Sequence, residues 1–387
     1  MKYSLFIFLI LLFSVPIFGQ EFKIPSGGSG GTVIIYGSGS KQNKDFSFQK
    51  TSEKYMYRDN NNSHLNKKYN PKSSDRDFIY YISKKYSPDA YYILSRCKHD
   101  IMEFFHKDVF DNRIDNLIAS YETMVHECHH GLDRTTAPIL MNLSGLSPSV
   151  EDLLRGGNTI KMPNSYFIEN QQHAIVHATE IFPSKQILPL LPDSLKDKNL
   201  PSYYRIQIYI DSKNPHQSTQ NMGIYGLLEE FSAYYQGMKA MYDIRKYYEN
   251  ESHHSSKAFS AARYFSMPLA NIYSGREFKI LILTYLVHAK NKHPEIYKEI
   301  MDNESFIKAF FAVEENFENL IIEAQTYQKN LLRDLEKSGT SIQIDKDRIK
   351  IDRHLIHDSL HYPEQYKNAL HQKDLKEMMK ILEGKRQ

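Results

Sequence analysis

The segment with the greatest density of chemically reactive side chains is YETMVHECHHGLDR, residues 121–134. It contains the pattern HExxH, formed by His126, Glu127 and His130. Residues four apart lie on one face of an α-helix, so both imidazoles can be directed at one metal ion. Zn²⁺ suits neutral nitrogen donors, and a catalytic zinc ion usually has three protein ligands and an open position for water. Glu127 is the candidate general base for that water.

The other residues inside the motif are expected to have different roles. His129 projects about 100° away from His130 around the helix, which predicts a position beside the site or at the surface. Cys128 points nearly opposite to His126, and we expect it to be a packing residue. The only other cysteine is Cys97, so the chain can form at most one disulfide.

A third metal ligand must come from elsewhere in the chain. No further histidine follows in the residues directly after the motif, which disfavours the longer pattern of metzincins. The segment GIYGLLEEFSAYYQGM, residues 223–238, has a helical pattern and contains Glu229 and Glu230. Ala233 follows Glu230 by one turn and, being small, would let this helix approach the first one closely. Tyr234 is placed to contact a ligand or the substrate.

An HExxH motif followed by a helical ExxA segment resembles the gluzincin group of zinc metallopeptidases. The resemblance is limited to these two helices. It implies that Glu230 is the third zinc ligand, with Glu229 as the alternative, and that Zn²⁺ is the cofactor. The position after Ala233, often an aspartate in that group, is Tyr234 here. The resemblance also implies a zincin-like catalytic core.

Peptide hydrolysis produces an oxyanion, which a tyrosine or a histidine can stabilise by a hydrogen bond. The candidates are His216, in the loop before the second motif, and Tyr225 and Tyr234 within it. We therefore assign Tyr234 and His216 to the catalytic group beside Glu127.

A rival metal site is offered by QQHAIVHATE, where His173 and His177 are also four residues apart and Glu180 follows. Because no glutamate is adjacent to the first histidine, this segment has no evident base. It would at most bind a structural metal.

Hydrophobic patterns predict an α+β protein that is predominantly helical. Apolar residues at three- and four-residue steps lead from a cap at Asp111 or Asn112 to Leu132, which places the HExxH motif on a helix. Further helical patterns cover residues 278–288 and residues 317–335, and the second of these ends at Gly339.

Strands are predicted where β-branched and aromatic residues gather. Residues 32–37, 77–83 and 203–211 have this composition, and residues 342–351 read as a small hairpin. The strand segments before the HExxH motif are expected to offer an edge with which an extended peptide substrate can pair.

The chain is divided by composition into four regions. Residues 1–19 place one lysine before an apolar run, as a secretory signal peptide does, which predicts a secreted or periplasmic protein. Residues 20–77 are rich in polar turn formers and predict a linker and mobile N-terminal region. Residues 78–273 are expected to form the zincin-like metallopeptidase core. Residues 274–387 are expected to form a mostly helical C-terminal region.

Charge and composition exclude several classes of partner. The chain of 387 residues contains 49 basic and 46 acidic residues, with a net charge of +3, and it has no long basic run that would indicate nucleic-acid binding. No later apolar run is long enough to cross a bilayer, so no stable membrane span is expected after signal cleavage. The expected partner is a peptide or protein substrate, and the sequence does not indicate an oligomeric state.

These observations predict an exported zinc-dependent metallopeptidase that hydrolyses peptide bonds. The first alternative is a hydrolase of a non-peptide bond that uses the same metal. The second is a non-catalytic exported or envelope-associated binding protein that retains a zincin-like fold.

Overall fold

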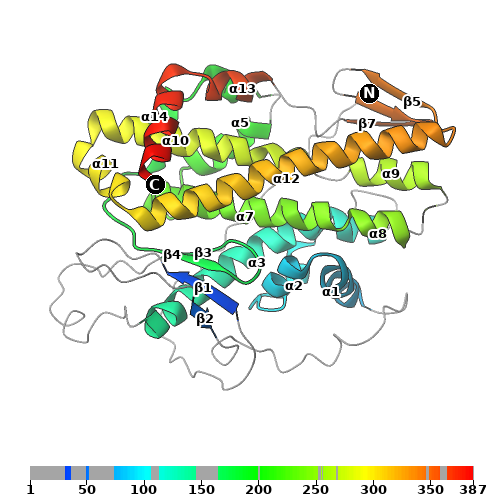
Figure 1. Cartoon of the computed structure of the whole chain (residues 1–387), viewed down its shortest axis with the longest axis horizontal. Coiled ribbons are helices and arrows are strands. Elements are labelled where there is room, and N and C mark those ends of the chain that lie inside the picture. Colours follow the sequence, from blue (N-terminus) through cyan, green and yellow to red (C-terminus); the bar gives the residue numbers. More distant parts are fainter. Residues whose placement is uncertain are drawn as a thin grey trace.

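The protein is predominantly helical, with two small sheets (Figure 1). Its structure is a computed structural model that describes residues 31–35, 49–51, 74–105, 113–144, 164–198, 201–251, 254, 256–266, 269–345, 348–357 and 364–386. The α-helices are α1 (Asp75–Tyr86), α2 (Pro88–Leu94), α3 (Arg113–Ser144), α5 (Pro201–Arg205), α6 (Ser218–Asn221), α7 (Ile224–Asp243), α8 (Arg245–Asn250), α9 (Lys257–Phe265), α10 (Ser274–Lys292), α11 (Pro294–Met301), α12 (Glu304–Lys337), α13 (Glu364–Leu370) and α14 (Lys373–Arg386). Short 3₁₀ helices are η3 (Ile101–Phe104), η4 (Ser184–Leu190), η5 (Asp193–Lys196) and η7 (Leu269–Tyr273), and η6 (Ile206–Ile210) is a π-helix.

The two sheets are short and stand apart in sequence. Strands β1 (Gly31–Ile35), β2 (Gln49–Thr51), β3 (Asn164–Phe167) and β4 (His173–Val176) form a mixed sheet in the order β2-β1-β4-β3, in which only β1 and β4 are parallel. Strands β5 (Ile342–Asp345), β6 (Arg348–Ile351) and β7 (His354–His357) form an antiparallel sheet in chain order.

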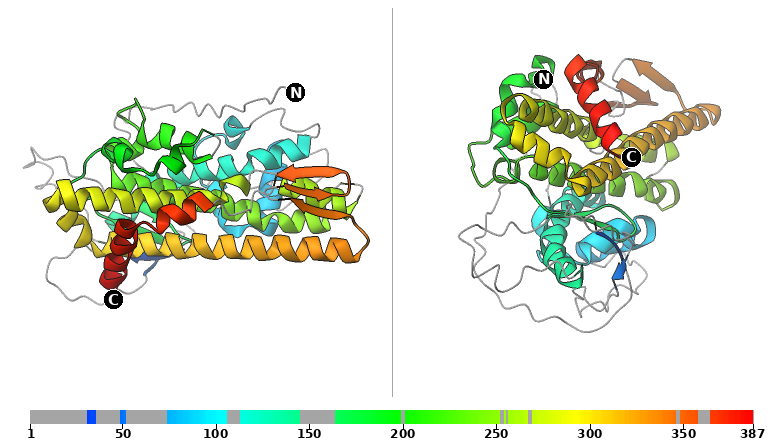
Figure 2. Two further views of the ribbon diagram at one scale, coloured as in Figure 1. Left: turned by 90° about the horizontal axis from the view of Figure 1, so that it is seen from above. Right: turned by 60° about the vertical axis from the view of Figure 1, so that its left-hand side comes forward.

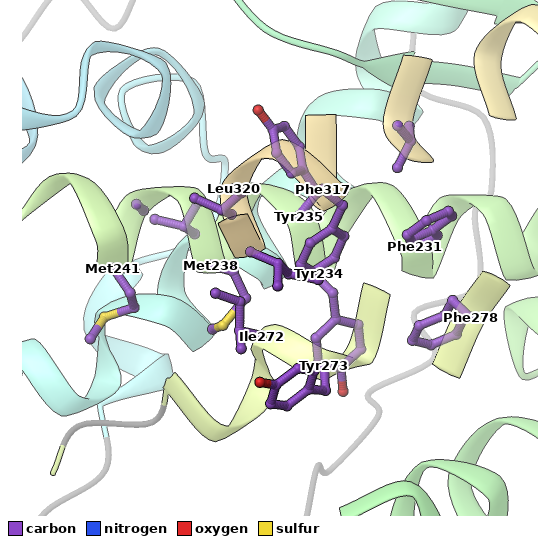
Figure 3. Packing of buried hydrophobic residues seen from close by; sticks show 14 of the residues in the cluster. Phe231, Tyr234, Tyr235, Met238, Met241, Ile272, Tyr273, Phe278, Phe317 and Leu320 are labelled. Atoms are coloured by element: carbon purple, nitrogen blue, oxygen red, sulfur yellow. The ribbon is translucent and has the colours of Figure 1, made fainter. Parts of the chain in front are cut away.

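Helix α7 lies at the centre of the protein and contacts α3, α10 and α12 (Figures 1 and 2). Every residue of α7 except Lys239 is buried, as expected for a helix with helices on several sides. Its aromatic side chains interlock with those of its neighbours: Phe231 stacks on Phe317 of α12, and Tyr234 packs against Phe278 of α10 (Figure 3). This packing gives the glutamates of α7 a rigid support.

Two glycines of α7 allow close approach of neighbouring chain. A Cβ at Gly226 would lie 2.4 Å from the carbonyl oxygen of Ser218, so only glycine lets α6 pack against the first turn of α7. A Cβ at Gly237 would lie 3.0 Å from the side chain of Glu122 on α3. Helices α3 and α7 are therefore in close contact along the faces that carry the two motifs.

The strand predicted at residues 77–83 is wrong, because these residues belong to α1. The hydroxyl of Ser74 accepts a hydrogen bond from the Asp77 backbone N–H (3.2 Å), and the Asp77 carboxylate accepts one from the Ser74 N–H (3.3 Å). This capping box starts a helix whose buried residues Phe78, Ile79 and Ile82 follow a helical spacing. Composition favoured a strand here, but the periodicity of burial is that of a helix.

The strand predicted at residues 203–211 is also wrong. The segment forms α5 and then the π-helix η6, which buries Ile206, Tyr209 and Ile210 at three- and four-residue steps. A π-helix leaves carbonyl groups out of the regular α-helical ladder. The carbonyl of Tyr209 instead accepts hydrogen bonds from the side chains of Thr219 and Gln220.

Several other sequence predictions are confirmed. Helix α10 is the expected buried helix. Helix α12 ends two residues before Gly339, which has a φ of +92°. Strands β5 and β6 form the expected hairpin. Helix α3 carries the HExxH motif and continues beyond Leu132 to Ser144.

Some predictions lie outside the described residues, among them the signal peptide, most of the N-terminal region and the cap at Asp111 or Asn112. Among the described helices, none has both the length and the apolar character that crossing a bilayer requires. The predicted division at residue 274 stays a prediction, although α10, which begins there, packs against α7.

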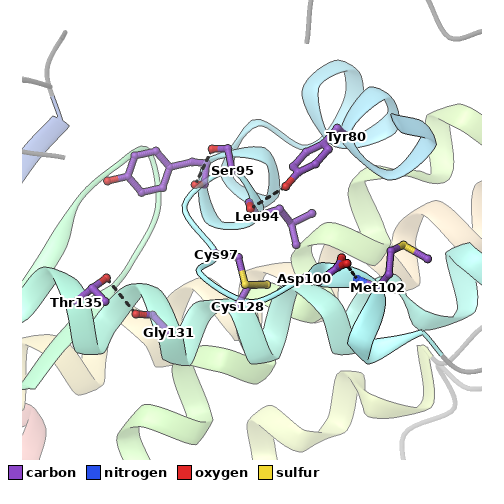
Figure 4. Close-up of a disulfide and its surroundings, with 10 residues drawn as sticks. Tyr80, Leu94, Ser95, Cys97, Asp100, Met102, Cys128, Gly131 and Thr135 are labelled. Carbon is purple, nitrogen blue, oxygen red and sulfur yellow. Dashed lines mark hydrogen bonds between the residues drawn. A yellow bond between two sulfur atoms is a disulfide. The ribbon is translucent and has the colours of Figure 1, made fainter. Parts of the chain in front are cut away.

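A disulfide joins Cys97, in the segment after α2, to Cys128 within the HExxH motif (Figure 4). Cys128 is fully buried in the core, as a packing residue should be, and it also forms the one disulfide that the sequence allowed. The sequence allowed only this pairing but did not show whether the bridge forms. The bond anchors the middle of α3 to the segment that follows α2.

We expect the double substitution of Cys97 and Cys128 by alanine to lower the free energy of unfolding by roughly 3–4 kcal/mol, because the cross-link closes a loop over a sequence separation of 31 residues. Urea denaturation of the oxidised native protein and of the variant measures the difference. Reductant should shift the native midpoint and leave the variant unchanged. Equal midpoints for native protein and variant would contradict the expectation.

Candidate metal centre

The two histidines of the HExxH motif and Glu230 converge on one point between α3 and α7. The Nε2 atoms of His126 and His130 are 3.1 Å apart, and the Oε2 atom of Glu230 lies 3.5 Å from each of them. Three ligands of a tetrahedral zinc ion are about 3.3 Å from one another when each bond is near 2.05 Å. The three donor atoms therefore already have the spacing that one ion requires.

The convergence is specific to these side chains. Among the described residues, His126, His130 and Glu230 are the only group of three or more histidine, cysteine or acidic side chains whose ligand atoms lie within 4.8 Å of one another. Ser218 of α6 donates a hydrogen bond to the Oε1 atom of Glu230 (3.1 Å), whereas Oε2 has no hydrogen-bond partner among the described residues. A buried oxygen without a partner is costly, and a metal ion would satisfy it.

The electrostatics of the site favour a positive charge. Burial alone would lower the pKa of His130, but the carboxylates of Glu230 and Glu229 outweigh it and raise this pKa well above its usual value. Burial alone would raise the pKa of Glu230, but the imidazoles of His130 and His126 hold this pKa below its usual range. A cation at the point of convergence would meet the same attraction.

Glu229, the alternative third ligand, lies on the other side of the His130 ring. Its Oε1 atom is 3.1 Å from Nδ1 of His130, and its side chain is 7% exposed. Because Nδ1 and Nε2 face in different directions, Glu229 and Glu230 contact opposite edges of one imidazole. The geometry favours Glu230 as the ligand.

Glu127, the candidate base, is half-buried on the same helix. Its negative charge contributes to raising the pKa values of Tyr209 and Glu122, after larger effects of burial, which places it near both residues. His129 is fully buried rather than at the surface, and its Nε2 atom lies 3.2 Å from the hydroxyl of Ser232 on α7. It joins α3 to α7 beside the ring of His130.

Two tyrosines border the centre. The ring of Tyr234 packs edge-on against His126 with ring centroids 4.6 Å apart, and its hydroxyl lies 3.3 Å from that of Tyr209. Burial, followed by the charge of Glu230, raises the pKa of Tyr209 well above its usual value. The hydroxyl of Tyr209 therefore remains protonated and can donate a hydrogen bond.

Sequence reasoning missed Tyr209 and Ser218. Tyr209 was hidden in the segment read as a strand, although its three-residue step from Ile206 is equally compatible with a helix. No sequence signal marked Ser218, because its contact with Glu230 depends on how α6 packs against the first turn of α7.

The remaining oxyanion candidates make no contact with the three converging side chains in the described part of the chain. The side chain of His216 is exposed, and its backbone N–H donates to the side chain of Asn214. The hydroxyl of Tyr225 lies 2.8 Å from the hydroxyl of Thr179 and accepts a hydrogen bond from the side chain of Asn303. Tyr225 thus links α7 to the start of α12.

The rival histidine pair is not arranged for a common ion. His173 begins β4, and His177 follows its end, so the side chains are separated by about 13 Å of extended chain. His173 is instead buried among hydroxyl groups, with Nδ1 3.2 Å from Ser165 and Nε2 3.4 Å from Tyr92. Burial lowers its pKa to about 3, so it is a neutral core residue.

The sheet limits where an extended substrate could pair. Strand β1 lies inside the sheet between β2 and β4 and offers no edge, whereas the edge strands are β2, which also precedes the motif, and β3. Strand β3 is the edge that contacts α3 and α7, but at Phe167 its outward groups are occupied. The Phe167 N–H donates to Asp133 (3.0 Å), and its carbonyl accepts from Ser232 (3.0 Å). A peptide cannot add to the sheet at that residue without displacing these buried contacts.

Comparison with known proteins supplies no relative from which a role could be transferred. No protein-family model matches the chain, and no curated protein or solved structure is significantly similar to it.

Proposed function

We propose that this protein is a zinc-dependent metallopeptidase. The observation that carries the proposal is the convergence of His126, His130 and Glu230 at the spacing of three zinc ligands. Glu127 follows His126 directly on the same helix. Zinc, when bound there, would supply a Lewis acid that lowers the pKa of water and polarises a carbonyl group. The Oε2 atom of Glu230, which has no hydrogen-bond partner in the part of the chain that the structure describes, supports this fit.

Residues of the chain would then have separate roles in the reaction. Glu127 takes the proton of the attacking water and passes it to the nitrogen of the leaving amine. Tyr209, held by the π-helix and hydrogen-bonded to Tyr234, is the hydroxyl best placed to donate to the oxyanion, because burial keeps it protonated. Tyr234 holds the ring of His126 in place through its edge-on contact.

The substrate class and location follow as parts of the same proposal. An internal peptide bond of a peptide or protein is the proposed target, and binding does not use the β3 edge at Phe167. The N-terminal apolar run supports export to the periplasm or the medium. The Cys97–Cys128 disulfide is compatible with an oxidising compartment.

Metal analysis of the purified protein tests the centre directly. We expect one zinc ion per chain in the native protein and none in His126→Ala, because two remaining ligands do not hold zinc against dialysis. His216→Ala is the matched control, since this exposed histidine lies outside the cluster and should retain one zinc. Absence of zinc from the native protein after dialysis against zinc-containing buffer would contradict the proposal.

A further inference from the structure

We propose that Glu229 is the positioning residue of the metal centre: it holds His130 by Nδ1 and so directs Nε2 to the ion. This inference rests on the proposed zinc site but does not depend on peptidase activity. The two adjacent glutamates of α7 would then act on one imidazole, with Glu230 beside Nε2 and Glu229 beside Nδ1.

The hydrogen-bonding chemistry determines which nitrogen is free. A neutral imidazole carries one proton, and an ionised carboxylate can only accept a hydrogen bond. In the neutral ring that a metal ion requires, the contact of 3.1 Å between Glu229 Oε1 and His130 Nδ1 favours the proton on Nδ1. The lone pair is left on Nε2, the atom that faces His126 and Glu230. The tautomer that Glu229 selects is the one that a metal ion needs.

The position of Glu229 on α7 explains why it can do this. Consecutive residues of a helix project about 100° apart, so neighbouring glutamates can reach around the two edges of a ring that lies between them. Both partners are largely buried, with side-chain exposures of 12% for His130 and 7% for Glu229. Water therefore competes little for the contact, and the ring cannot easily turn away.

The two ligand histidines are held by different means. Nδ1 of His126 has no hydrogen-bond partner in the described part of the chain, and this ring is positioned by the edge-on contact with Tyr234. His130 is instead held by the carboxylate of Glu229. Loss of Glu229 should consequently release one ligand only, which weakens binding without abolishing the site.

Zinc affinity, measured by competition with a chromogenic chelator, tests the proposal. Removing an outer partner of a ligating histidine typically weakens metal affinity by about 10–100-fold. We expect a loss in this range for Glu229→Ala, with one zinc still bound at saturation. Glu229→Asp keeps the charge but shortens the reach to Nδ1, and it should behave like the alanine variant. Glu229→Gln keeps an acceptor oxygen and should lose less.

Glu122→Gln is the matched control, because Glu122 is also a buried carboxyl group near His126 but makes no hydrogen bond to a ligand histidine. Its zinc affinity should stay at the native value. Circular dichroism of each zinc-free variant checks the fold.

Three results would overturn the inference. Unchanged affinity in both Glu229→Ala and Glu229→Asp would show that the contact does not position His130. An equal loss in Glu122→Gln would assign the effect to general charge. Loss of stoichiometric zinc in Glu229→Ala, with retention in Glu230→Ala, would make Glu229 the ligand itself.

The failure of this inference and that of the proposed function are distinguishable. A native protein that binds zinc but cleaves no peptide contradicts only the peptidase proposal. A native protein without zinc affinity overturns both.

Discussion

Glu127→Gln is expected to lower the rate of peptide hydrolysis by roughly 10²–10⁴-fold, the range that a positioned general base contributes. Glutamine has nearly the shape of glutamate but cannot take a proton from water. Because Glu127 is not among the converging ligand atoms, the variant should still bind one zinc per chain. Initial rates on an unfolded protein substrate, with zinc content determined on the same samples, provide the measurement.

The combination of the two readouts separates the candidate functions. If Glu127→Gln retains zinc but no longer cleaves a peptide that the native protein cleaves, the peptidase proposal is supported. If the native protein instead cleaves only an ester or a non-peptide amide, and Glu127→Gln does not, a different hydrolase is favoured. If the native protein cleaves none of these substrates while it binds zinc, the binding-protein alternative is favoured. Equal activities of native protein and Glu127→Gln would contradict the assigned base. Glu103→Gln, the same substitution at an exposed glutamate outside the centre, is the control and should keep the native activity.

The convergence of the two motif histidines could be predicted from the sequence because their relation is local. The spacing of His126 and His130 fixes their common face once the segment is known to be helical, and the apolar periodicity of α3 establishes the helix. Glu230 is distant in sequence, and only the resemblance to ExxA segments singled it out. The structure brings it to within 3.5 Å of both imidazole nitrogens.

What surrounds the ligands could not be predicted, because it depends on contacts between distant segments. The Cys97–Cys128 bond and the hydrogen bond from Ser218 to Glu230 exist only once α2, α3, α6 and α7 are packed together. Local composition was also misleading in two segments, where tyrosines and isoleucines favoured strands but helical burial prevailed. Tyr209 was missed for that reason.

A buried ion pair supports the segment that carries Tyr209. Arg205, the last residue of α5, donates two hydrogen bonds to Glu277 of α10, one of them 2.9 Å long, and a third to Asn271 (3.0 Å). The hydroxyl of Tyr366 on α13 donates to the same carboxylate. Burial would lower the pKa of Arg205, but Glu277 outweighs it and raises this pKa, so the arginine is charged. The pair joins α5, α10 and α13 behind the site.

Arg205→Ala should therefore lower the free energy of unfolding by about 3–5 kcal/mol, the cost of leaving one member of a buried pair without its partner. The cost arises from the stranded carboxylate more than from a large attraction in the pair, since both charges must be desolvated. Exchanging both members for apolar residues, in Arg205→Met with Glu277→Leu, should consequently recover much of the loss.

Urea denaturation of the two single variants and the double variant forms a cycle that measures this. If the effects of the single variants simply add in the double variant, the pair is not coupled and this account is wrong.

The hydrolytic activity of the zinc-loaded double variant, Arg205→Met with Glu277→Leu, is a second measurement. Because Arg205 directly precedes the π-helix, this activity shows whether the pair affects catalysis separately from fold stability. The double variant lacks the guanidinium group that lies 5.6 Å from the Tyr234 ring. It should regain stability more fully than hydrolytic activity, since Tyr234 and its partner Tyr209 would lose a fixed neighbour.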